Sequence, residues 1–197
     1  ASLSAVEIAR SLRAILDDAK NFSALLDKVT EIDDSKKAVI TENGSYPYDS
    51  LVLATGARTS YFGKDEWAKH TFGLKTLEDS RQIRHQVLNA LERAERSTDP
   101  EERKRLMTVA SVGGGPTGVE LAGAFSDLVR RALKSDYRRI DVKDFRIVLI
   151  QSGDRVLKSL AADHSEYTRE RLEKLGVEVI LGTRVDNVKE HYFHLKD

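Results

Sequence analysis

The sequence has 197 residues, enough for a sizeable hydrophobic core in one domain or in two smaller ones. Its 32 basic and 32 acidic residues balance, so the composition argues against a general nucleic-acid-binding protein but allows a small anionic ligand. The absence of cysteine excludes disulfides and thiolate metal sites, and the five histidines lack the spacing of a metal site. The apolar runs are far shorter than the roughly 20 residues that cross a bilayer.

The first part of the chain predicts a helix followed by short strands. Apolar residues at helical spacing, behind a Ser-x-x-Glu capping box, predict an amphipathic helix over residues 4–19. Residues 22–32 and 38–41 favour strands, and Asn43-Gly44 is a strong signal for a hairpin turn.

The next stretch predicts a buried strand and then a connection between domains. Residues 50–54 are almost wholly apolar, which is typical of a strand inside a covered, parallel sheet, and the small-residue turn Ala54-Thr55-Gly56 follows. Residues 57–76 show no clear period, and we interpret them as the interdomain connection. They pack across a groove or ligand, or form a satellite cluster under a loop, through four aromatic side chains: Tyr61, Phe62, Trp67 and Phe72.

The rest of the chain alternates helices and strands. Residues 76–96 have the apolar stripe of an amphipathic helix, and Asp99-Pro100 begins a short second helix. Residues 107–181 then follow the order β-α-β-α-β, which predicts a doubly wound, Rossmann-like parallel sheet of the α/β class. The predicted pieces are a strand at 107–112, a helix from 116, a charged and solvated extension at 130–141, a strand at 145–151, a helix ending at Gly176, a strand at 177–181 and a further strand pair within 185–195.

A glycine-rich turn lies where the first of these strands meets its helix. Gly113, Gly115 and Gly118 satisfy G-x-G-x-x-G, with roles in the tight turn, in the approach of a pyrophosphate and in close packing of the helix on the strand. Pro116 and Thr117 lie between them, and proline suits the first turn of a helix. Because free N–H groups and the helix dipole point at this turn, it predicts a phosphate cradle for a dinucleotide.

Two polar side chains near the turn have more than one interpretation. Gln151 occupies the place where an acidic residue usually binds the adenosine ribose, so it can still bind a 2′-hydroxyl without repelling a 2′-phosphate. Arg155 lies nearby, and NADP is therefore not excluded beside NAD. Glu120 either contacts the nicotinamide end of the ligand or only favours the positive end of the helix. No G-x-S-x-G nucleophile motif and no P-loop lysine is present, and no catalytic residue is assigned.

Two motifs together resemble a known family. They are Gly113-Gly114-Gly115-Pro116-Thr117-Gly118-Val119-Glu120 and the upstream Tyr48-Asp49-Ser50-Leu51-Val52-Leu53-Ala54-Thr55-Gly56-Ala57. The chain resembles flavoproteins with two dinucleotide-binding domains and, among them, type II NADH dehydrogenases, which are single-chain NADH:quinone oxidoreductases. Three further stretches support this: 60–63 with Trp67, 73–79 and 137–141.

The resemblance implies two domains that bind different cofactors. Residues 1–75 would be part of a Rossmann-like FAD-binding domain with its connection, and residues 76–197 would be the NAD(P)-binding domain. The turn Ala54-Thr55-Gly56 would lie against FAD, and Glu120 would face the nicotinamide. NADH would pass a hydride to FAD, and the reduced flavin would reduce a quinone at the inner, cytoplasmic face of a membrane. The resemblance also allows a homodimer.

The chain departs from the family pattern in three places. The FAD fingerprint belongs upstream of residue 1, the second flavin motif and the membrane-associating segment belong downstream of residue 197, and Gln151 replaces the usual acidic residue. We therefore expect a fragment that neither holds FAD tightly nor turns over alone. The alternatives are a soluble disulfide or ferredoxin reductase of the same superfamily, and a non-catalytic dinucleotide-sensing or interaction module.

Overall fold

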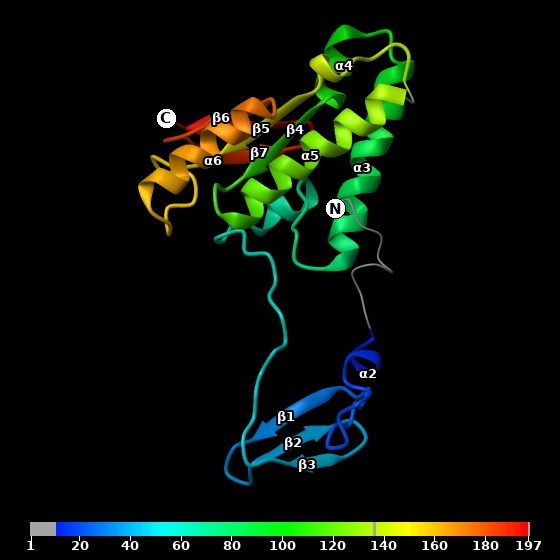
Figure 1. Cartoon of the computed structure of the whole chain (residues 1–197), viewed down its shortest axis with the longest axis vertical. Coiled ribbons are helices and arrows are strands. Elements are labelled where there is room, and N and C mark those ends of the chain that lie inside the picture. The colour runs from blue at the N-terminus through cyan, green and yellow to red at the C-terminus, as the bar shows by residue number, and fades with distance from the viewer. Residues whose placement is uncertain (1–10, 136, 197) are drawn as a thin grey trace. The chain divides into compact units, whose positions relative to one another are not determined.

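The computed structural model describes residues 11–135 and 137–196, which divide into two compact units, residues 11–57 and residues 58–196 (Figure 1). The first unit holds one three-stranded antiparallel sheet. The second holds a three-stranded parallel sheet with its helices and a two-stranded antiparallel hairpin.

The first unit is a small antiparallel sheet with one helical turn. Strands β1 (Val29–Asp33), β2 (Ala38–Thr41) and β3 (Ser45–Pro47) pair in that order. The hairpin predicted at Asn43-Gly44 is confirmed, since Ile40 pairs with Ser45 across this turn. None of the side chains of residues 11–57 is buried.

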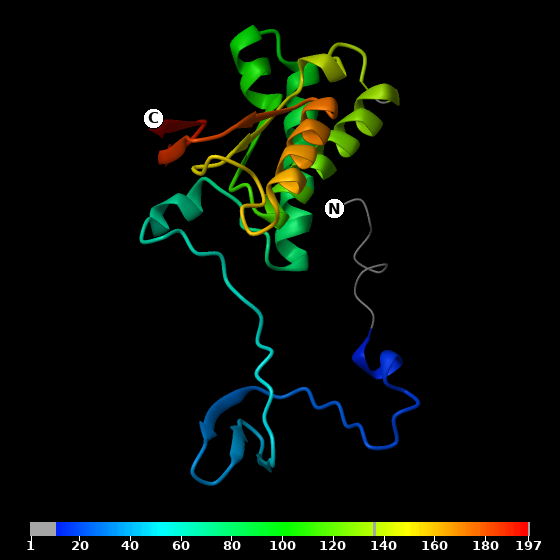
Figure 2. The ribbon, with the colours of Figure 1, turned by 60° about the vertical axis from the view of Figure 1, so that its left-hand side comes forward.

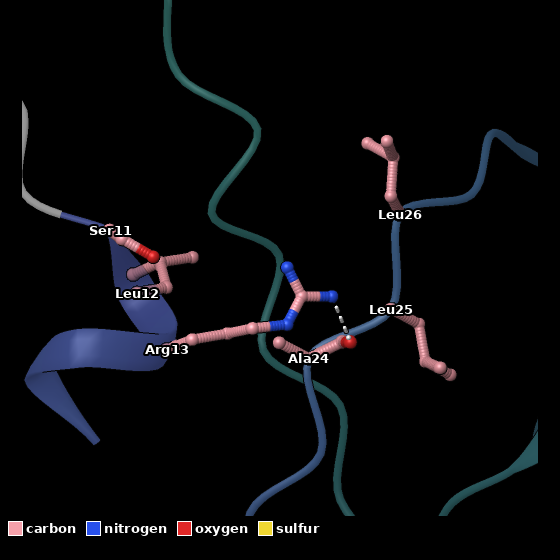
Figure 3. A pocket seen from close by; sticks show the side chains of 6 residues that line it. All are labelled: Ser11, Leu12, Arg13, Ala24, Leu25 and Leu26. Carbon is pink, nitrogen blue, oxygen red and sulfur yellow. Dashed lines mark hydrogen bonds between the residues drawn. The ribbon is translucent and has the colours of Figure 1, made fainter. Parts of the chain in front are cut away.

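Arg13 connects the helical turn of this unit to the chain that follows it. The turn α2 spans Leu12–Ile15, and the Arg13 guanidinium donates to the carbonyl of Ala24 at 2.9 Å (Figure 3). A hollow there is lined by Ser11, Leu12, Arg13, Ala24, Leu25 and Leu26.

Three predictions for this unit are wrong in part or in whole. Of the helix expected over 4–19, the first residues lie outside the described part of the chain, and only Leu12–Ile15 of the rest is helical. Within 22–32, the strand begins only at Val29. Residues 50–54 form no strand, and Val52 is 85% exposed. An apolar run becomes a buried strand only when neighbouring strands pair with it, and among the described residues none does.

The second unit begins with two helices whose ends match the sequence signals. Helix α3 (Leu77–Arg96) starts at a capping box, in which Thr76 accepts from the Asp79 N–H and Asp79 accepts from the Thr76 N–H. Its predicted apolar stripe is buried: Ile83, Val87, Leu91 and Ala94. Helix α4 (Pro100–Leu106) is capped by Asp99, as expected for Asp-Pro at a helix start.

The parallel sheet of the second unit confirms the predicted β-α-β-α-β order. Strands β4 (Thr108–Val112), β5 (Arg146–Ile150) and β6 (Val177–Ile180) lie side by side in sequence order. Helix α5 (Pro116–Ser135) connects the first pair, and α6 (Ala162–Lys174) connects the second. All three strands therefore end at the same edge of the sheet, where the glycine-rich turn follows β4 and Gln151 follows β5.

Helices pack on one face of the parallel sheet, and a β-hairpin with a short 3₁₀ helix packs on the other (Figures 1 and 2). Ile147 and Leu149 of β5 face a core that includes side chains of α3, α5 and α6. Val148 and Ile150 face the other way and pack with residues of β7 (Arg184–Lys189), β8 (Tyr192–Lys196) and the 3₁₀ helix η1 (Asp65–Lys69). The strands β7 and β8 form the predicted hairpin.

The aromatic connection packs partly on this second face. Trp67 of η1 lies against the cluster around Val148 and Ile150, so the prediction of a satellite cluster is confirmed for this side chain. Lys64 lies over its ring, with Nζ 4.6 Å from the centroid, and also donates to the Asp186 carbonyl.

The charged extension after α5 is more than a solvated surface. The carboxylate of Glu95 on α3 accepts hydrogen bonds from the backbone N–H groups of Arg138, Arg139 and Ile140, at 2.9 to 3.2 Å. A short 3₁₀ helix, η2 (Val142–Asp144), then leads into β5. These bonds fix the path between α5 and β5 against the end of α3.

Candidate functional site

The glycine-rich turn brings the start of α5 against the end of β4. The Gly113 N–H donates to the Ile150 carbonyl at 2.8 Å, and Gly113 has φ +110°, which is a conformation that favours glycine. A Cβ added to Gly118 would lie 1.9 Å from the Gly113 carbonyl oxygen. Glycine at position 118 is therefore required for the helix to approach the turn this closely, as the motif predicts.

The outer side of the turn is open. Gly115, Pro116 and Thr117 are exposed, and a Cβ added to Gly115 would meet nothing within 4 Å. The first bond of the helix runs from the Val119 N–H to the Gly115 carbonyl at 3.1 Å. The N–H groups of Thr117 and Gly118 precede this bond, so they have no partner within the helix and are available to an anion.

Gln151 contacts the turn on the side away from its open face, through Gly114. Its Oε1 accepts a hydrogen bond from the Gly114 N–H at 2.9 Å. The Gly114 carbonyl in turn accepts from the Leu157 N–H at 2.7 Å, so both polar groups of Gly114 are bound to the segment after β5. A Cβ on Gly114 would lie 3.1 Å from side-chain atoms of Gln151 and of the buried Val156. These contacts fix the position of Gly114 within the turn.

Sequence reasoning assigned Gln151 to the site but missed Gly114, Val156 and Leu157. The signal for Gly114 was the third consecutive glycine of the motif, which G-x-G-x-x-G does not require. No sequence pattern marks Val156 or Leu157, because their roles depend on how the loop after β5 folds back onto the turn.

The other predicted site residues lie farther from these contacts. Glu120 is exposed on the first turns of α5, and its contact with nicotinamide stays a prediction. Arg155 is half-buried in the loop after β5, where its guanidinium donates to the Lys158 carbonyl at 3.1 Å.

The predicted flavin turn belongs to the other compact unit. Ala54, Thr55 and Gly56 are all exposed, and Gly56 has φ +76° with open space where a Cβ would point. This geometry allows a flat ligand to approach the backbone at Gly56. The assignment of these residues to FAD stays a prediction.

The described ranges, 11–135 and 137–196, lack both a metal-binding cluster and a membrane-spanning helix. These residues contain no group of three or more His, Cys, Asp or Glu side chains that could bind a metal ion. They also contain no helix with both the length and the apolar character needed to cross a bilayer.

The chain is similar to proteins of one family. The family model for pyridine nucleotide-disulphide oxidoreductases matches residues 2–196. Two Mycobacterium tuberculosis proteins described as type II NADH:quinone oxidoreductases, Ndh and NdhA, are 41% and 40% identical over 97% and 94% of this chain. The chain spans 42% and 40% of their lengths, or about two fifths.

Solved structures give the same fold. The structure of NDH2 from Plasmodium falciparum in complex with NADH has a TM-score of 0.76 at 30% identity, over 87% of this chain and 36% of that one. A ferredoxin reductase from Rhodopseudomonas palustris has a TM-score of 0.63 at 19% identity, over 91% of this chain and 37% of that one, so it shows the fold alone.

Proposed function

Because the chain belongs to the pyridine nucleotide-disulphide oxidoreductase family, we propose that it is the NADH-binding portion of a flavin-dependent NADH:quinone oxidoreductase. Residues 76–197 are the NAD(P)-binding domain in this proposal, and residues 1–75 belong to the FAD-binding domain and its connection. The observation that carries the proposal is the open glycine-rich turn, where Gly115 is exposed and the N–H groups that precede the first bond of α5 have no partner within the helix.

The residues of the turn fit the pyrophosphate of a dinucleotide. Backbone N–H groups of Thr117 and Gly118 donate to its oxygens, and the open space at Gly115 lets it reach them. Gln151 and Leu157 keep Gly114 fixed, so these donors are in place before the ligand arrives.

Two further assignments belong to this proposal, one in each compact unit. Glu120 positions the nicotinamide, and Ala54-Thr55-Gly56 lies along the flavin. The nicotinamide and flavin groups supply the hydride chemistry when bound, while the protein orients the rings and excludes water. The final acceptor is a quinone at a membrane surface, reached through other parts of the full-length protein. This acceptor is supported by the activity for which the two mycobacterial relatives are named, NADH:quinone oxidoreduction.

The first test separates ligand binding from folding at Gly115. Because a Cβ at this position points into open space, Gly115→Ala and Gly115→Val should fold normally but obstruct the pyrophosphate. We expect isothermal titration with NADH to show an affinity loss of about tenfold or more, as for the loss of one or two charge-assisted hydrogen bonds. Gly123→Ala on the same helix is the matched control, because its Cβ also points into open space.

The outcome decides between the candidate functions. Unchanged NADH affinity in both Gly115 variants, with unchanged circular dichroism, would refute the cradle assignment. If the unmodified chain bound neither NADH nor ADP-ribose at millimolar concentration, the enzyme proposal would lose its support. An interaction module would then be the better description.

A further inference from the structure

The turn at Asn43-Gly44, between β2 and β3, is a chemically reactive point of the chain that the proposed function does not use. Both residues are exposed, and Gly44 has no side chain to shield its backbone nitrogen from the carboxamide carbon of Asn43. We propose that Asn43 is a site of spontaneous deamidation, and that Asp27 converts this modification into opening of the β2–β3 hairpin. This inference is independent of the proposed function.

The reaction needs only water as a second reactant. The Gly44 nitrogen loses its proton and forms a bond to Cγ of Asn43, the bond from Cγ to Nδ2 breaks, and ammonia leaves. Water then opens the cyclic imide at either carbonyl and leaves aspartate or isoaspartate at position 43. Nothing is oxidised or reduced, and the net change is the replacement of an amide by a carboxylate.

Hydrogen bonds within the turn control when the reaction can begin. The Gly44 N–H donates to the Thr41 hydroxyl at 3.0 Å, and the Gly44 carbonyl accepts from the Thr41 N–H at 2.9 Å. The Gly44 nitrogen can attack only after the first of these bonds opens. Because no side chain of residues 11–57 is buried, opening of this hairpin breaks no hydrophobic core and costs little free energy.

Asp27 is the residue that gives a new carboxylate its structural effect. Its Oδ1 accepts from Nδ2 of Asn43 at 2.8 Å, and its Oδ2 accepts from the Thr41 hydroxyl at 2.7 Å. The Thr41 hydroxyl lowers the pKa of Asp27 most, desolvation opposes this shift, and the Asn43 amide lowers the pKa further. Asp27 is therefore charged in neutral solution, and a carboxylate at position 43 would face it where the donor Nδ2 was.

The lysine beside Asp27 is already paired. Lys28 Nζ lies 2.7 Å from Oε1 of Glu42, which precedes Asn43 in the turn. Deamidation thus exchanges a hydrogen bond to a charged acceptor for repulsion between like charges. Isoaspartate also lengthens the backbone of the turn, which disturbs the pairing of Ile40 with Ser45. Both products therefore favour the open hairpin.

Peptide mapping after incubation at mildly alkaline pH tests the reaction itself. We expect aspartate and isoaspartate to accumulate at position 43 about tenfold faster than at the asparagines that precede larger residues. These are Asn21, Asn89 and Asn187. Gly44→Ala should slow the reaction at Asn43 and still fold, because its Cβ would lie 3.6 Å from Tyr46, an ordinary contact. Equal accumulation at all of these asparagines would overturn the proposal.

Hydrogen exchange of residues 38–47 tests the structural effect. Asn43→Asp should exchange about tenfold faster, the factor expected for loss of one hydrogen bond to a charged group. Asp27→Asn combined with Asn43→Asp again sets a donor opposite an acceptor, so its exchange should return to within about threefold of the unmodified chain. Asn21→Asp, the same change outside the hairpin, is the control and should have no effect. Unchanged exchange in Asn43→Asp, or no recovery in the double variant, would refute the role of Asp27.

Discussion

Gly118 and Gly123 lie on the same helix but differ in the space around them. An added Cβ at Gly118 would lie 1.9 Å from a carbonyl oxygen, whereas one at Gly123 would meet nothing within 4 Å. Gly118→Ala should therefore push α5 away from the turn and lower the free energy of unfolding by about 3 kcal/mol, as for severe overpacking. Gly123→Ala should raise it by about 0.5 to 1 kcal/mol, because alanine suits a helix interior better.

Urea denaturation of both variants beside the unmodified protein gives these values directly. Equal stability of the two variants would mean that the helix does not depend on close approach at Gly118. The midpoints of the two curves should instead move in opposite directions.

The individual glycines were predictable from the sequence, but their partners were not. The motif gave the conformational reasons for Gly113 and Gly118, and both hold in the structure. The hydrogen bond between Gly114 and Gln151 joins residues 37 positions apart, so no local pattern indicates it. The sequence predicted that Gln151 lies at the dinucleotide site. The structure adds that its Oε1 accepts a hydrogen bond from the backbone N–H of Gly114.

At the level of elements, one ion pair connects β5 to β6. Arg146 donates to both carboxylate oxygens of Glu178, with Nε 2.8 Å from Oε2 and Nη2 3.0 Å from Oε1. These hydrogen bonds lower the pKa of Glu178, and partial burial opposes the shift. Both side chains are about half exposed, so solvent screens the pair and we expect a coupling energy below about 1 kcal/mol.

The pH dependence of this pair has a definite sign. Because the pKa of Glu178 is lower in the folded state, the stabilisation is fully present above the unfolded value near 4.5 and is lost as the pH falls through the folded value. A double-mutant cycle with Arg146→Gln and Glu178→Gln, measured by urea denaturation, should show a larger coupling at about pH 7 than at about pH 3. A coupling that is equal at both pH values would contradict this origin.

Helices and parallel strands were predictable where the pattern was long. Helix α3 has both a periodic apolar stripe and a capping box, so its start and its buried face were foreseen. Residues 50–54 show the opposite case, because an apolar run indicates burial but does not supply the neighbour that buries it. The sequence did not predict that residues 137–140 are held against α3, because this depends on hydrogen bonds to the carboxylate of Glu95. A glutamate on a helix far away in the sequence gives no local signal of such a role.

At the level of the whole molecule, the two units differ in how much they bury. The described residues of the first unit, 11–57, have no buried side chain, whereas the second has clusters on both faces of its sheet. Chain without a core opens easily, and proteases cut at opened segments. We therefore expect limited trypsin digestion to cleave within residues 11–57 first and to leave a resistant piece that starts near Arg58.

Mass spectrometry of the digestion products identifies the cleavage sites. NADH should slow cleavage in the second unit more than in the first, because the proposed cradle lies only in the second. Equal resistance of the two units, or first cleavage within β4, β5 or β6, would contradict the difference in burial.

The β7–β8 hairpin sets a limit on how far this chain can be shortened. Val148 and Ile150 of β5 are each 1% exposed because Val185 and Phe193 of the hairpin, together with Trp67, cover them. Removal of the hairpin or of the segment with Trp67 would expose Val148 and Ile150 to water. These side chains belong to the central strand of the sheet whose ends carry the glycine-rich turn. A minimal dinucleotide-binding probe made from this protein therefore has to begin before Asp65 and to retain β8.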